Sequence, residues 1–128
     1  MDLDQVFLLL SQKGIDNVNL DMFDLEKKKE IYEKYAYMFN DHNGVDATYI
    51  VVKSYAKAKN LTKAKERLLN EMDLGAKDKK YKYCYFCALL LNNNEMASFF
   101  EQFIAECLDK DVDYNNFYFE LKKEIELI

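Results

Sequence analysis

The amino-acid sequence predicts an all-α protein of about seven short helices, and three observations support this fold class. The 128 residues include no proline and only three glycines, whereas sandwiches and barrels need turn residues every few positions. Apolar residues recur along most of the chain with the i, i+3, i+4 spacing of amphipathic helices. The breaks between these stretches are short and rich in Asp and Asn, which suits antiparallel helical hairpins.

Length and composition favour one folded domain over residues 1–128. Half of the residues are hydrophobic, 15% are aromatic and 32% are charged, which is too apolar for a disordered chain. Asp2 and Asp4 stand where a signal peptide carries Lys or Arg. The longest apolar run, Tyr83 to Leu91, is too short to cross a bilayer. We therefore expect a cytoplasmic protein without membrane contact, whose three cysteines stay reduced.

The first two helices are predicted before position 41. Asp2 or Asp4 is expected to cap the first helix, which Gly14 closes. Asp21 or Asp24 is expected to open the second, which runs to about position 40, and its lysines and glutamates form a solvated face. The predicted inner side chains are Val6, Leu9, Leu10, Leu25, Ile31, Tyr32, Tyr35, Met38 and Phe39.

The clearest hairpin is predicted over residues 46–75. Asp46 is expected to cap a helix to about Lys59, and Thr62 to cap a second helix that Gly75 ends. The predicted inner side chains are Tyr49, Val52, Tyr55 and Ala56 in the first helix and Ala64, Leu68 and Met72 in the second, with Val51 and Leu69 at the edges.

A second hairpin is predicted over residues 78–108, followed by a C-terminal helix over 113–128. Asp78 is expected to cap the fifth helix, the Asn92–Asn94 break to cap the sixth, and Asp111 or Asp113 to start the seventh. The predicted inner side chains are Tyr81, Tyr85, Ala88, Leu89, Leu91, Met96, Phe99, Phe100, Phe103, Ile104, Cys107, Phe117, Tyr118, Leu121 and Ile125.

The two hairpins carry a weak internal repeat of 32 residues. The repeat relates Tyr49 to Tyr81 and Asn60 to Asn92. A period in the low thirties with two helices per unit is typical of helical solenoids.

The first hairpin also resembles a known family in its residues. Tyr55-Ala56-Lys57-Ala58, Leu61, Lys63-Ala64, Leu68, Glu71-Met72 and Gly75 are similar to a tetratricopeptide or pentatricopeptide repeat. Ala64 stands where both families need a small residue for close helix approach, and Tyr55 and Leu61 match their hairpin-packing positions. The resemblance implies a TPR/PPR-like α-α superhelix. If the repeat is pentatricopeptide-like, the implied ligand is RNA.

Basic side chains are concentrated in the middle of an acidic chain. The formal net charge is −5, but residues 53–82 hold ten basic and four acidic side chains. Lysines at the start of the fifth helix oppose its dipole by roughly 0.3–1 kcal/mol each, and free N–H groups there form an anion site. This segment is either a patch for phosphates or an acidic partner, or a solvated basic face. The candidate partner-binding residues are Lys53, Lys57, Lys63, Arg67, Lys77, Lys79, Lys80, Lys82 and Tyr83.

No arrangement of residues in the sequence predicts catalysis, a cofactor or a metal site. Cys84 and Cys87 form a C-x-x-C motif, but Cys107 and His42 are the only further candidate ligands for zinc. Cysteines inside an apolar helix usually act as small hydrophobic residues, and a lone histidine in a polar turn gives little support to a general base. We therefore expect a protein that is not an enzyme and needs no cofactor.

Two functional hypotheses remain open. The first is a protein-binding adaptor whose stacked hairpins hold a segment of another protein. The second is an RNA- or ribosome-associated protein in which Tyr81, Tyr83 and Tyr85 stack on bases beside the lysines. The alternative for these tyrosines is that Tyr81 and Tyr85 pack between hairpins while Tyr83 is exposed.

Overall fold

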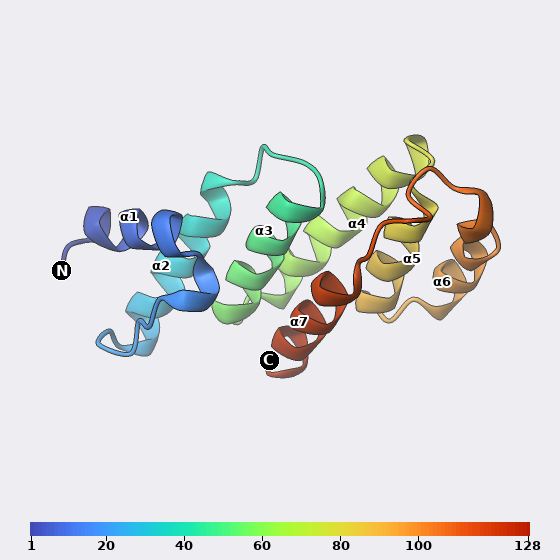
Figure 1. Ribbon diagram of the computed structural model, residues 1–128. Coiled ribbons are helices and arrows are strands. Elements are labelled where there is room, and N and C mark those ends of the chain that lie inside the picture. Colours follow the sequence, from blue (N-terminus) through green and yellow to red (C-terminus); the bar gives the residue numbers. More distant parts are fainter.

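The computed structural model describes all 128 residues and contains seven α-helices, two short 3₁₀ helices and no β-strand. Helices α2 to α6 each pack against the next in chain order, which produces a row of antiparallel helices (Figure 1). The all-α prediction is therefore confirmed. None of the helices combines the length and apolar surface that crossing a bilayer requires. The elements are α1 (Leu3–Lys13), η1 (Ile15–Asn17), α2 (Leu25–Met38), α3 (Val45–Lys57), α4 (Leu61–Lys77), α5 (Tyr81–Leu90), α6 (Asn94–Glu101), η2 (Ile104–Glu106) and α7 (Asn115–Glu126).

Side-chain caps fix the start of several helices where the sequence predicts them. The Asp2 carboxylate accepts the Gln5 N–H, and the Gln5 side chain accepts the Asp2 N–H, so that α1 begins with a complete capping box. Gly14 closes α1. Asp24 caps α2, and Asn93 caps α6. Each cap satisfies a backbone donor that would otherwise lack a partner in its helix.

Three predicted caps are wrong. Asp46 lies in the first turn of α3 and not before it. Asn60, rather than Thr62, caps α4 by accepting a backbone N–H. Asp78 ends α4, and α5 begins after Lys80 without a cap from a neighbouring side chain. At α3 and α5 an aspartate therefore marks the approximate helix boundary but does not form the cap.

The three turns between α3 and α6 share one backbone geometry. Lys59, Lys79 and Asn92 lie in the left-handed region with φ values of 61°, 57° and 54°. The N–H of the residue after each of them returns to a carbonyl of the preceding helix, as in the Schellman motif. Asn60 and Asn93 are equivalent caps in these turns. In the structure Asn60 therefore corresponds to Asn93, one residue later than the Asn92 with which the sequence repeat matches it.

The apolar interior consists of two clusters. The larger one joins α3, α4, α5, α6 and α7, and the smaller one joins α1, η1 and α2. Some predicted inner side chains prove exposed because their elements lie at the margins of the row. These are Leu25, which is 82% exposed, together with Met38, Phe99 and Phe103. The sixth helix is also shorter than predicted, since α6 stops at Glu101.

Helix α5 buries a different face from the predicted one. Of the predicted inner residues, Ala88 is buried, but Tyr81, Tyr85, Leu89 and Leu91 are only half-buried. Tyr83, Cys84, Cys87 and Leu90 are buried instead. Tyr83 is 5% exposed, so the expectation that it is exposed is wrong. The reason is that α5 contacts α4, α6 and α7, and a helix covered on several sides has no single inner stripe.

Gly75 does not end α4, which continues to Lys77. A Cβ at this position would lie 2.9 Å from Cys84 Sγ and 3.4 Å from the Tyr83 ring. Both neighbours are themselves buried. The glycine is therefore required for the close approach of α4 and α5.

We predict that Gly75→Ala destabilises the protein. The better helix propensity of alanine contributes about 1 kcal/mol, but overpacking a buried contact costs about 1–3 kcal/mol. Urea unfolding of Gly75→Ala, of Cys84→Ala and of the double variant measures the net change in the free energy of unfolding. The double variant should recover part of the loss. A single variant that is more stable than the wild type would contradict the prediction.

Candidate functional site

After α6 the chain turns back from the end of the row, and α7 lies against the middle of the row. It packs against α3 and α5, as Figure 1 shows. Phe117 and Leu121, one helical turn apart, are buried there, and so is Tyr114, which precedes the helix. Asp113 accepts the Asn115 N–H at the start of the helix. The α3–α5 side of the row is thus covered by the chain itself.

The segment before α7 carries a buried carboxylate, Asp109, which attaches this segment to the start of α5. Asp109 accepts the backbone N–H groups of Lys82 at 3.2 Å and of Tyr83 at 2.9 Å. It also accepts the Tyr114 hydroxyl at 2.7 Å and the Cys107 thiol at 3.0 Å. The anion site expected at this helix start therefore exists, but the protein's own Asp109 occupies it.

The electrostatic balance at Asp109 favours its charged form. Burial acts to raise the pKa of this carboxyl, but the hydrogen bonds from Cys107, Tyr114 and the two backbone N–H groups outweigh burial, so that its pKa lies below the usual value. An ionised Asp109 therefore stabilises the contact between the segment before α7 and the start of α5.

Lys53 and Lys57 meet acidic side chains from distant parts of the chain. Lys53 is 3% exposed and pairs with Asp16 and, at 3.3 Å, with Glu120. Lys57 pairs with Glu124 at 3.1 Å. Burial acts to lower the pKa of Lys53, but hydrogen bonds to Asp16 and the Tyr49 hydroxyl raise it instead. These two lysines attach α7 and η1 to α3.

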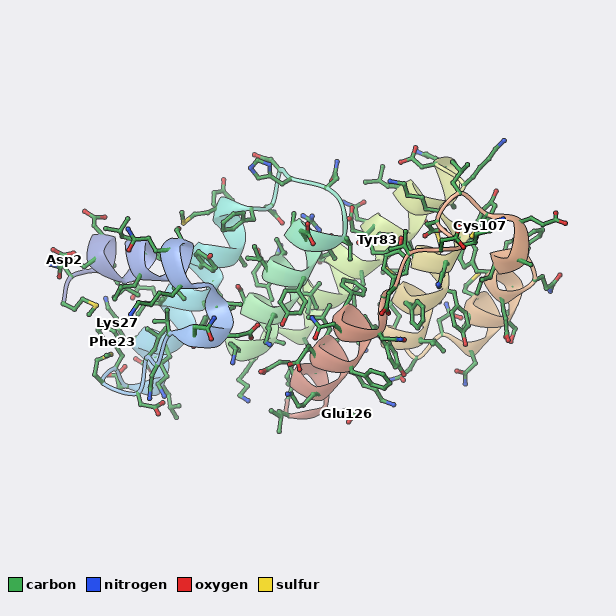
Figure 2. The ribbon with its side chains drawn as sticks, in the orientation of Figure 1. Asp2, Phe23, Lys27, Tyr83, Cys107 and Glu126 are labelled. Atoms are coloured by element: carbon green, nitrogen blue, oxygen red, sulfur yellow. The ribbon has the colours of Figure 1, made fainter.

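Three further candidate residues have internal partners. Lys82 donates to the carbonyls of Lys110 and Val112. Arg67 is buried and donates to two carbonyls of the loop before α3. Tyr83 is buried against α7 (Figure 2). Only Lys63, Lys77, Lys79 and Lys80 of the candidate set remain exposed, and Lys63 pairs with Glu66.

A buried polar network joins α3, α4 and α5. Arg67 Nε donates to Thr48 Oγ1 at 3.1 Å, and Thr48 donates to Glu71 Oε1 at 2.5 Å. Glu71 Oε1 also accepts the Tyr83 hydroxyl at 3.0 Å and the Gly44 N–H at 2.8 Å. Sequence reasoning missed Thr48 and Glu71. The available signal was that Arg67 and Glu71 interrupt the apolar stripe of α4 at helical spacing.

A wide hollow on the surface lies between α2 and α4. It has a volume of about 690 Å³. We call it the α2–α4 groove. Phe7, Tyr37, Met38 and Tyr55 supply its apolar surface, and Tyr37 is 74% exposed. Its charged rim carries both signs and consists of Glu26, Lys29, Glu30, Glu33, Lys34 and Lys63.

Cys84, Cys87 and His42 do not line the α2–α4 groove. Cys84 and Cys87 are free and buried, and Cys84 Sγ contacts the Met72 carbonyl. Burial, together with the nearby Asp109, raises the pKa of Cys84 to about 12. No three His, Cys, Asp or Glu side chains converge as metal ligands. His42 is exposed in the loop before α3.

Comparison with protein-family models, curated protein sequences and solved structures finds no significant match for this chain. The resemblance to tetratricopeptide and pentatricopeptide repeats therefore stays a prediction from the residues.

We predict that Asp109→Asn lowers the free energy of unfolding at neutral pH by roughly 1–3 kcal/mol, because it weakens hydrogen bonds to a charged, buried group. The folded-state pKa of Asp109 is below its unfolded value of about 3.8. Its contribution is thus present above that value and is lost as the pH falls through the folded pKa.

Urea unfolding at neutral pH and in steps below about pH 5 measures both effects. Asp111→Asn is the matched control, since Asp111 is exposed on the same segment. Equal stability losses in the two variants, or an unchanged pH dependence in Asp109→Asn, would contradict the role given to this carboxylate.

Proposed function

We propose that this protein is a non-catalytic interaction module that binds another protein, an adaptor built as a TPR-like stack of helical hairpins. The observation that carries the proposal is the α2–α4 groove, which combines exposed aromatic and aliphatic side chains with a charged rim. Exposed apolar surface bordered by polar residues is typical of protein-binding sites.

We infer that the partner contributes an amphipathic helix to this groove. The support comes from α7, which already packs across two alternate helices of the row. Phe117 and Leu121 anchor α7, while Glu120 and Glu124 pair with lysines of α3. The α2–α4 groove likewise lies between alternate helices, with Tyr55 of α3 on its lining. A helix with apolar side chains at i, i+3 or i+4 and charges beside them fits such a groove.

We predict that Tyr37→Glu combined with Met38→Glu weakens partner binding at least about thirtyfold. The protein should stay folded, since both side chains are exposed. Loss of an apolar anchor costs about 2 kcal/mol, or roughly thirtyfold in affinity. Affinity capture with nuclease-treated extract, followed by anisotropy with the helical segment of the captured protein, measures this loss.

Phe119→Glu is the control, because Phe119 is exposed on α7 and lies outside the groove. A partner that binds the groove variant and the wild type equally would remove the groove from the proposal. A partner whose contact segment is not helical would contradict the inferred ligand.

The alternative function, binding to RNA or the ribosome, is favoured by one observation. Lys77, Lys79 and Lys80 are exposed around the α4–α5 turn and form no ion pair. Lys110 is exposed as well, and its segment contacts this turn through the Leu108 N–H, which donates to the Lys79 carbonyl. This smaller lysine group replaces the wider patch that the sequence predicts.

We predict that, if RNA is a ligand, its affinity falls steeply between about 50 mM and about 200 mM salt, because phosphate contacts release counterions. Reversing Lys77, Lys79 and Lys80 to Glu should then abolish filter binding of single-stranded RNA. Reversal of the exposed Lys13, Lys65 and Lys122 is the charge-matched control. Absence of binding at the lower salt concentration would exclude the alternative.

A further inference from the structure

A second, smaller pocket lies on another part of the molecule from the α2–α4 groove. It has a volume of about 290 Å³. The loop at residues 43–45, the last turns of α4, the start of α5 and Tyr114 form its walls. This volume is near the lower limit for small-ligand sites, which suits one functional group rather than a large molecule.

Glu71 reaches this pocket from the buried side of α4. The residue is only 2% exposed and yet belongs to the pocket lining. Its Oε1 atom accepts the three hydrogen bonds from Gly44, Thr48 and Tyr83. Its Oε2 atom accepts none from the chain, and no Lys or Arg lies within ion-pair distance of the carboxylate. Arg67 is connected to it only through Thr48.

The two carboxylate oxygens of Glu71 thus differ in their hydrogen bonds. One oxygen attaches the loop before α3 to α4 and α5. The other presents a carboxylate lone pair to a confined space. A buried carboxylate without a cationic partner is costly, since charges inside proteins are normally paired. The pocket therefore contains a carboxylate oxygen of Glu71 that has no cationic partner from the chain.

We propose that this pocket binds a primary ammonium group, with Glu71 Oε2 as its principal acceptor. One free oxygen suits the compact ammonium ion, whereas a guanidinium group pairs best with both oxygens of a carboxylate. A divalent cation needs several oxygen ligands, and the chain assembles no group of three acidic or histidine side chains here.

The remainder of the lining is consistent with an alkylammonium ion. Tyr83 and Tyr114, whose ring centroids are 5.5 Å apart, supply aromatic surface, which attracts cations and packs against methylene groups. Asp78 and Lys80 lie on the lining with opposite charges, and both side chains are exposed. With Glu71 included, the charges around the pocket sum to a net negative value. The ammonium group belongs either to a free alkylamine or to a lysine side chain of another protein.

A ¹H–¹⁵N NMR titration of the full chain with n-butylammonium chloride tests the proposal. The Gly44 and Gly75 amide signals, which report on the pocket walls, should shift and saturate, whereas 1-butanol should leave them in place. Nα-acetyl-lysine methylamide separates the two sources. Binding equal to that of butylammonium indicates a lysine side chain, and weaker binding indicates a free amine.

Glu71→Gln should weaken butylammonium binding at least about tenfold, because it replaces a charge-assisted hydrogen bond by an amide. Glu66→Gln, an exposed acid on the same helix, is the control and should bind like the wild type. Val45→Phe narrows the pocket while Glu71 keeps its charge, so its loss of binding provides a second measure if Glu71→Gln does not fold. Shifts of equal size with 1-butanol, or undiminished binding in Val45→Phe, would overturn the proposal.

Discussion

The structure depends most on the pair of charged side chains that α4 carries into the interior. Arg67 and Glu71 stand one helical turn apart and hold Thr48 of α3 between them. Arg67 also binds the carbonyls of Asn40 and His42, and Glu71 binds the Gly44 N–H. The loop between α2 and α3 has no apolar core of its own. Side chains of α4 bind three backbone groups of the loop and so attach it to the row.

Four of the ten basic side chains of residues 53–82 bind groups from distant parts of the chain and are not exposed, namely Lys53, Lys57, Arg67 and Lys82. Lys53 and Lys57 lie close to the other lysines in sequence, but their acidic partners come from η1 and α7. The Lys82 ammonium donates to two carbonyls of the segment before α7. Asp16 and Glu120 approach Lys53 from opposite ends of the chain. An excess of positive charge in a local stretch of sequence can therefore be partly neutralised by the tertiary fold, whereas Lys59, Lys65 and the lysines at the α4–α5 turn stay exposed and form no ion pair.

Local signals in the sequence predict most of the helices but fewer of their contacts. Asp2, Gly14 and Asp24 act over a few residues, so their caps could be predicted. The inner line of α4, with Ala64, Leu68 and Met72, is also confirmed. The buried face of α5 could not be found in this way, because α7 covers Tyr83 and no pattern within α5 records that contact. The α2–α4 groove and the role of Glu71 likewise depend on residues brought together only by folding.

The position of α7 also decides which side of the row is open to a partner helix. Displacing α7 from α3 and α5 would expose Tyr114, Phe117 and Leu121, which are buried. At about 1.5–3 kcal/mol for each large side chain, the cost is roughly 5–9 kcal/mol, before the ion pairs with Lys53 and Lys57 are counted. A domain of this size is stable by about 5–15 kcal/mol in total. A partner helix would therefore spend most of its binding free energy on removing α7, whereas the α2–α4 groove requires no such displacement. The cost of displacing α7 and the exposure of Tyr37 and Met38 thus both favour the α2 side of the row.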